Sequence, residues 1–184
     1  QMIEFTTLNI ISFVLIFFIG LPHGSFDGAV ASLVGFKTKI QFFQFIISYL
    51  VLFVFVIYFW INFPILSLSI FLFMTIVHFG LCDWSNLKIR KHKYIVSATY
   101  GMTVIFGIIY FNENQSFKIF EYLTNSSIYN LQKFFIVPYL TTLVLILCLI
   151  YLSFYEKKLR LCVVEIICLS LIFYNLDALL GFSI

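Results

Sequence analysis

Charged residues are scarce in this sequence. Asp, Glu, Lys and Arg make up 10% of its 184 residues, whereas 62% are hydrophobic and the mean hydropathy is +1.08. A soluble domain of this length cannot bury so much apolar surface in one core, so a soluble protein is excluded. Apolar runs recur along the whole chain, which also excludes a single signal peptide before a polar mature chain. The sequence is therefore that of an integral membrane protein.

Cysteines are also few, and they lack the spacing of a metal site. Cys82, Cys148, Cys162 and Cys168 form no CxxC pair and fall in or near apolar runs. Such cysteines behave as small packing residues. We therefore expect no disulfide framework.

Apolar windows of about 17 to 25 residues mark helices that can span a membrane. The sequence has about six of them, and none shows the alternation of apolar and polar residues typical of a membrane β-barrel. They lie at 5–35, 41–61, 63–84, 94–111, 134–154 and 161–184. The predicted fold class is all-α, a polytopic transmembrane helix bundle that forms one integral-membrane domain over residues 1–184.

Basic residues cluster in alternate loops between these windows. Nine of the eleven Lys and Arg residues fall at 37–39, 88–93 and 157–160. By the positive-inside rule these loops face the cytoplasm and the N-terminus lies outside, in a multi-pass protein of the cell (inner) membrane. The polar stretch 114–133 then falls on the outer side, where its apolar residues predict an interfacial helix.

The first apolar run is interrupted by the sequence GLPHGSFD at residues 20–27. A straight helix over residues 5–36 would be about 48 Å long, well beyond a hydrocarbon core of about 30 Å. Pro22 removes a backbone donor, so a break in the helix is predicted there. The i to i+4 spacing places His23 and Asp27 on one face, where the carboxylate can orient the imidazole. Both side chains are expected to point inward.

A second histidine motif, VHFGLCD, lies in the third apolar run. His78 is followed by Gly80 and Asp83, which repeats the order of histidine, glycine and acid found around His23. Each motif precedes a basic loop, and lysine side chains can extend to the interface. The two imidazoles are therefore expected at a similar depth, toward the cytoplasmic side.

Two membrane histidines with adjacent acids are typical of a metal site. Imidazole is a ligand for iron, zinc, copper or nickel, and an acid can fix its tautomer. His23 and His78 are the predicted ligands, and Asp27 and Asp83 are predicted to orient them. Two ligands are too few for a stable site. The alternative is that each histidine forms only a hydrogen bond between helices, which contributes about 1 kcal/mol or less.

Three further polar residues have simpler interpretations. His92 lies among lysines in a loop, where a solvated, uncommitted side chain is expected. Glu165 lies near Arg160 and the cytoplasmic surface, which favours snorkelling or a helix–helix hydrogen bond over a role beside a metal. Asp177 falls near the outer end of the last apolar run and is interpreted as structural.

The two histidine motifs resemble those of the Brp/Blh family of membrane β-carotene 15,15'-dioxygenases, GLPHGxxD and HFGxxD. A weaker likeness covers the whole chain, including Gly101 and the LLGF sequence near residue 181. The resemblance implies an iron(II) enzyme that uses O₂ to split the central double bond of β-carotene into two molecules of retinal. In that family four histidines hold the iron. His23 and His78 match the first two.

The resemblance departs at the C-terminus. Family members continue past an LLGF-like stretch into a segment similar to WHSxRH, which supplies the last two histidines, whereas this sequence stops at Ile184. On this resemblance we expect a fragment whose remaining ligands lie beyond Ile184 and which is inactive alone. Some relatives carry a histidine directly after the first motif's aspartate. Gly28 stands there, so no ligand is inferred.

Two other classes of function stay open on the sequence. A broken helix with His/Asp pairs is also how many transporters build an ion path. A non-catalytic carotenoid- or retinal-binding membrane protein is the other, because phenylalanine-rich helices can line a slot for a long apolar molecule. The expected partners of the enzyme are β-carotene, O₂ and the lipid bilayer, with a retinal-binding rhodopsin as downstream consumer and no nucleic acid. Bound iron would separate the enzyme from both alternatives.

Overall fold

The computed structural model describes residues 10–18, 27–82 and 91–183, which are almost entirely helical and contain no strand. The all-α prediction is therefore confirmed for this part of the chain. Residues 10–18 form one helix. The others are α2 (Asp27–Val34), α3 (Lys39–Asn62), α4 (Pro64–Cys82), α5 (Lys93–Phe111), α6 (Glu113–Thr124), α7 (Ile128–Tyr155), α8 (Leu159–Asn175) and α9 (Ala178–Ser183).

Four of the described helices are long and apolar enough to cross a membrane. They are α3, α4 up to Leu81, α5, and α7 from Leu131 onward, with mean hydropathies between 1.6 and 2.5. Their burial differs widely, because 61% of the α5 window is buried by the rest of the chain and none of the α3 window is. A helix that is apolar all round is suited to an apolar solvent on its uncovered faces, which a bilayer would provide for α3.

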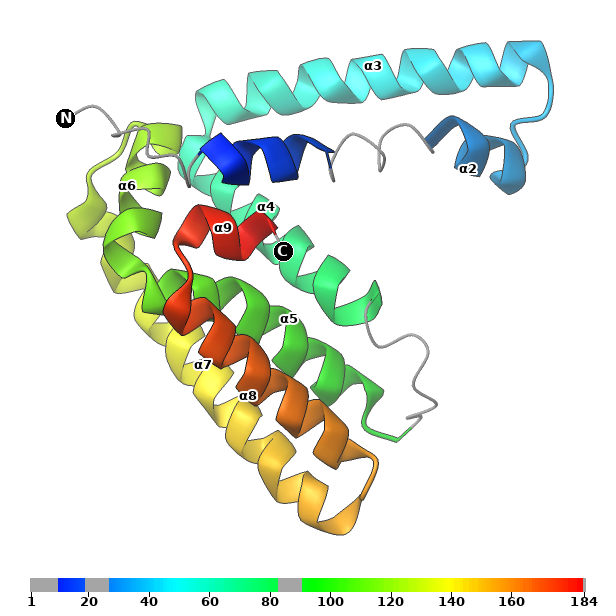
Figure 1. The fold of residues 1–184 in the computed structure, drawn as a ribbon. Helices are drawn as coiled ribbons and strands as arrows, with labels where there is room; N and C mark the ends of the chain where they lie inside the picture. The colour runs from blue at the N-terminus through cyan, green and yellow to red at the C-terminus, as the bar shows by residue number, and fades with distance from the viewer. Residues whose placement is uncertain (1–9, 19–26, 83–90, 184) are drawn as a thin grey trace.

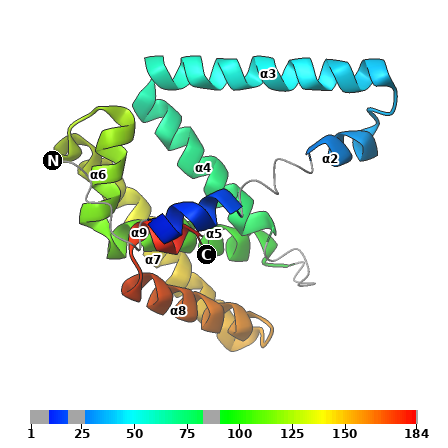
Figure 2. The same ribbon diagram turned by 45° about the horizontal axis from the view of Figure 1, so that its top comes forward.

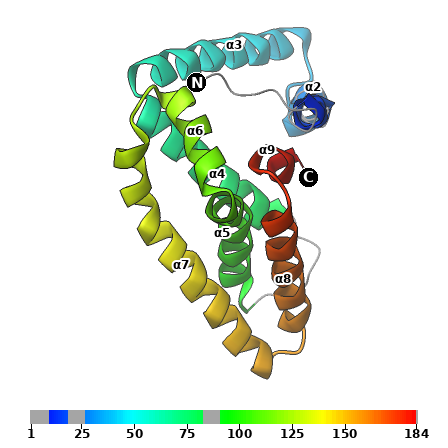
Figure 3. The same cartoon turned by 60° about the vertical axis from the view of Figure 1, so that its left-hand side comes forward.

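Helix α5 is the centre of the packing. It contacts α4, α6, α7, α8 and α9, and in Figure 3 it lies between α7 and α8. More than half of its residues are buried, including Val96, Ile105 and Ile108. Because these helices all pack against α5, their positions in the bundle depend on it.

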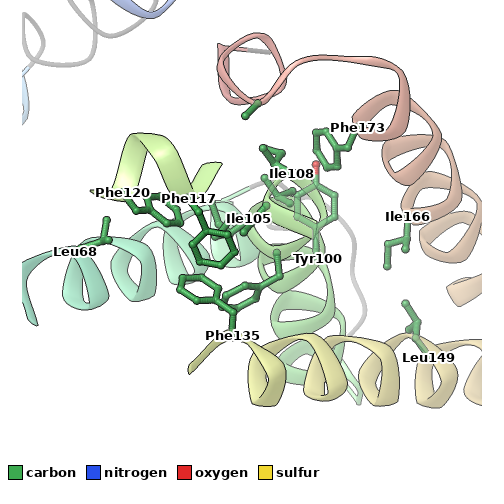
Figure 4. Close-up of a cluster of buried hydrophobic side chains, with 14 of the residues drawn as sticks. Leu68, Tyr100, Ile105, Ile108, Phe117, Phe120, Phe135, Leu149, Ile166 and Phe173 are labelled. Carbon is green, nitrogen blue, oxygen red and sulfur yellow. The ribbon is translucent and has the colours of Figure 1, made fainter. Parts of the chain in front are cut away.

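A cluster of aromatic rings joins α5, α6 and α7 at one end of the bundle (Figure 4). Phe117 of α6 is fully buried, and its ring lies 5.1 Å from that of Phe135 at 88°. Phe120 stacks on the same Phe135 ring at 5.8 Å. Edge-to-face and offset stacking each add stabilisation beyond the area that the rings bury. The cluster therefore holds α6 over the ends of the longer helices.

Helix α3 extends away from this bundle, with α2 beside it (Figures 1 and 2). It begins with a capping box, in which Thr38 Oγ1 accepts a hydrogen bond from the Gln41 N–H and Gln41 Oε1 accepts one from the Thr38 N–H. Near its other end, Trp60 Nε1 donates to the carbonyl oxygen of Leu123 at 3.1 Å. The hydrogen bonds described here thus lie near the two ends of α3, while the side chains between them are not buried by the rest of the described chain.

The structure divides one of the expected spans. The apolar run 161–184 is not one helix, because α8 ends at Asn175 and α9 starts at Ala178. Asn112 Nδ2 donates to the Phe173 carbonyl, and Gln115 Oε1 accepts from the Ala178 N–H. These side chains satisfy backbone groups that the break leaves without helical partners. A hydropathy pattern cannot show such a break, since the residues on both sides of it are apolar.

Two other expectations meet the structure in part. The predicted break at Pro22 lies outside the described residues. Helix α2 ends at Val34 and is followed by Gly35, whose φ of 123° favours glycine. The predicted interfacial helix at 114–133 is shorter: α6 ends at Thr124, followed by Asn125 in the left-handed region, and α7 begins at Ile128. Phe117 and Phe120 face the core rather than a membrane surface, while Tyr122 is exposed.

The predicted orientation can be tested with two tyrosines at opposite ends of the bundle. Tyr94 at the start of α5 and Tyr122 in α6 are 83% and 79% exposed, so a cysteine at either place is accessible. In a chain whose native cysteines are serine, we expect a membrane-impermeant maleimide to label Tyr122→Cys in intact spheroplasts and Tyr94→Cys only after permeabilisation. The reverse pattern would contradict an external N-terminus.

Candidate functional site

His78 lies on α4, one turn before that helix ends at Cys82, and its side chain is exposed. Its ring is in edge contact with Phe79, with the ring centroids 5.7 Å apart. An imidazole that is exposed on its helix can be reached by a ligand. The exposed position of His78 is therefore compatible with the predicted metal role.

The opposite face of α4 is pressed against α5. Gly80 is buried there, beside the backbone of Ser97, and Gly101 of α5 lies against the backbone of Ile76. His78 is two residues from both Ile76 and Gly80, and two residues turn a helix by about 200°. The imidazole thus leaves α4 on the side away from α5.

The other predicted site residues are only partly placed. His23 and Asp83 lie outside the described residues. Asp27 is the first residue of α2, but the position of its side chain lies outside the described part. Over 10–18, 27–82 and 91–183, no three His, Cys, Asp or Glu side chains come together as a metal site. The ligand set of His23 and His78 with Asp27 and Asp83 stays a prediction.

His92 is more constrained than the sequence indicated. Its Nε2 lies 3.5 Å from Glu156 Oε2, and the His92 side chain is 19% exposed. The contact joins the turn before α5 to the turn before α8, two segments that are more than 60 residues apart in the chain. The expectation of a solvated, uncommitted His92 is therefore wrong. No local sequence pattern predicts the contact between His92 and Glu156, because it depends on where α7 ends in the folded structure.

The structure gives Glu165 and Asp177 different degrees of burial. Glu165 is partly buried on α8. Asp177 is exposed between α8 and α9, and its backbone carbonyl accepts a hydrogen bond from the Gly181 N–H at 2.8 Å. This contact closes the first turn of α9.

The sequence does not locate a cavity. The structure has an apolar groove of about 720 Å³ between α4, α5 and α7. Such a volume is typical of sites for small apolar molecules. The lining residues are Ser69, Leu72, Phe73, Ile76, Val77, Gly80, Leu81, Tyr94, Ser97, Ala98, Met102, Phe106, Phe134, Phe135, Val137, Pro138 and Thr141. His78 is not one of them and points to the other side of α4. The groove and the histidine therefore belong to different faces.

Comparisons with known proteins give a consistent result. The sequence profile of the family described as beta-carotene 15,15'-dioxygenase matches residues 14–184. A curated protein named beta-carotene 15,15'-dioxygenase, from an uncultured marine bacterium 66A03, is 34% identical over 113 residues, which are 60% of this chain and 41% of that protein. No solved structure matches the chain.

The contact between His92 and Glu156 should have a small, measurable effect on stability. Because both side chains are partly exposed, we expect a coupling free energy of about 0.2 to 1 kcal/mol. A double-mutant cycle with His92→Asn and Glu156→Gln, followed by thermal unfolding in detergent, measures it. Glu121→Gln on α6 serves as the control with no coupling to His92. Coupling equal to that of the control would show that the pair contributes nothing.

Proposed function

Because the chain belongs to the beta-carotene 15,15'-dioxygenase family, we propose that it cleaves the central 15,15' double bond of β-carotene with O₂ to give two molecules of retinal. The observation that carries the proposal is the match of residues 14–184, which includes both histidine motifs. The matched relative bears the same name but extends well beyond the aligned part.

The membrane character of the chain supports a substrate of this kind. β-Carotene is a long hydrocarbon that dissolves in the bilayer, and the described helices present apolar side chains on most of their outer faces. A substrate held within the bilayer reaches a histidine on a lipid-accessible helix without crossing water. We therefore place the enzyme in the cell membrane as a multi-pass protein.

For the metal we propose iron(II), with His23 and His78 among its ligands. The donor chemistry fits, because neutral imidazole suits iron and His78 is exposed on the face of α4 away from α5. Bound iron supplies the redox chemistry that O₂ needs to react with an alkene. Asp27 and Asp83 would accept a hydrogen bond from the imidazoles and hold each ring in one tautomer. The surrounding apolar helices would exclude water from the reacting double bond.

Replacing either predicted ligand should abolish retinal formation. We would express the longest natural reading frame that contains this chain in β-carotene-producing cells, beside His23→Ala and His78→Ala, and quantify carotene loss and retinal. His92→Ala is the matched control, since His92 pairs with Glu156 rather than with a predicted ligand. Retinal from parent and control, with none from equally expressed His78→Ala, is the expected result. An iron-loaded parent that cleaves no carotenoid would overturn the proposal and favour a transport or binding role.

The two aspartates should affect metal binding less than the histidines do. Residues that orient a ligand typically change metal affinity by about 10- to 100-fold. We expect Asp27→Asn and Asp83→Asn to lower iron(II) affinity by that factor, measured by iron titration of the purified protein. Asp177→Asn, exposed between α8 and α9, should leave the affinity unchanged. Unaltered affinity in both of the first two variants would remove them from the site.

A further inference from the structure

Helices α4 and α5 meet at a contact made by backbone rather than by side chains. A methyl group on Gly80 would overlap the carbonyl oxygen of Ser97 and come within 3.0 Å of the Ser97 carbonyl carbon. A methyl group on Gly101 would overlap the carbonyl oxygen of Ile76 and lie 3.2 Å from Gly80 N. The two glycines thus face each other's helix, and the spacing Ser97 to Gly101 is the small-xxx-small pattern of membrane helix pairs.

The direction of these overlaps shows what stabilises the contact. In each glycine, the hydrogen that a methyl group would replace points at a carbonyl oxygen of the other helix. This is the Cα–H···O arrangement that recurs at close helix crossings. Because a carbonyl within a helix cannot move without its helix, the two axes are fixed in separation, depth and rotation at this point.

His78 lies on the part of α4 that the contact fixes. The two α4 residues that contact α5, Ile76 and Gly80, lie two positions before and two positions after His78. The His78 side chain therefore leaves the opposite face of the helix. A change in the rotation or depth of α4 at Gly80 would therefore carry the imidazole with it. A ligand or catalytic group must be held to within about 0.5 Å to work well.

We propose that Gly80 and Gly101 are positioning residues, whose backbone contact sets the place of the His78 imidazole. The inference rests on the proposed function in so far as His78 is a metal ligand. In the HFG sequence at residues 78–80, the glycine and the histidine then have distinct roles. Gly80 fixes the position of α4 against α5, and His78 binds the metal from the opposite face of α4. Gly101 supplies the matching half of the contact from α5.

Two other glycines provide matched controls. A methyl group on Gly107, also in α5, would lie 3.2 Å from the ring of Phe173, and one on Gly181 would lie 3.5 Å from Ile108. Both neighbours are side chains that can adjust, and neither belongs to α4. Gly107→Ala therefore adds the same methyl group to the same helix as Gly101→Ala, without reaching the backbone of α4.

The displacement can be measured without relying on catalysis. Nitroxide labels at His78→Cys on α4 and Phe154→Cys on α7, in a chain whose native cysteines are serine, report the position of residue 78 by electron–electron double resonance. Phe154 is 73% exposed and suits a label. We expect Gly80→Ala and Gly101→Ala to shift the distance by on the order of 1 Å, the distance needed to restore van der Waals contact. Gly107→Ala and Gly181→Ala should leave it unchanged.

The effect on metal binding and activity is measured in the protein expressed from the longest natural reading frame, with His78 unchanged. We expect Gly80→Ala and Gly101→Ala to lower iron(II) affinity by about 10- to 100-fold and to alter the visible absorption of bound Co(II). The kcat for retinal formation should fall by about 10²-fold, with KM for β-carotene little changed. Both controls should keep the parent's Co(II) spectrum even if they unfold at a lower temperature.

The outcomes separate this inference from the proposed function. A parent that cleaves no carotenoid overturns the function, while the label distances still decide whether the glycines place residue 78. An unshifted distance in both crossing variants overturns the inference, and so does a shifted distance with parental metal affinity and kcat in an active enzyme. Failure of both crossing variants to fold, with both controls folded, would assign the contact to stability alone and also overturn it.

Discussion

The backbone contact between α4 and α5 is the constraint on which the described structure depends. Apolar side chains gain little by leaving lipid for another helix, so membrane helices associate through close packing and polar contacts. Gly80 and Gly101 let α4 and α5 approach until the backbone of one helix meets that of the other. Helix α5 then presents its other faces to α6, α7, α8 and α9, and each takes its place from that common axis.

The aromatic cluster complements this contact at the end of the bundle. Phe117, Phe120 and Phe135 lock α6 to α7 beside α5, and the amide groups of Asn112 and Gln115 reach the backbone around the break between α8 and α9. Trp60 ties the end of α3 to the same region. These three polar contacts between helices thus lie where helices end and backbone groups need partners, while the long faces of α3 and α7 remain apolar and exposed.

The contact between α4 and α5 leaves the two faces of α4 with different roles. Toward α5 it presents Ile76 and Gly80, which set its position, and on the far side it presents His78. The spacing of two residues between histidine and glycine turns the helix by about 200°, so packing and chemistry do not compete for one surface. An apolar groove of about 720 Å³ opens on the packing side between α4, α5 and α7, separate from the histidine.

Composition and hydropathy alone determined that the protein is an all-helical membrane protein, because each apolar run must satisfy its own backbone in lipid and only a helix does so within one segment. The histidine motifs alone pointed to the family, since they are short and local. Tertiary structure decided that Gly80 meets Ser97, that His92 meets Glu156, and that the last apolar run breaks before Ala178. Each of these depends on residues distant in the chain, whose relative depth and rotation are set by packing and leave no trace in a local pattern.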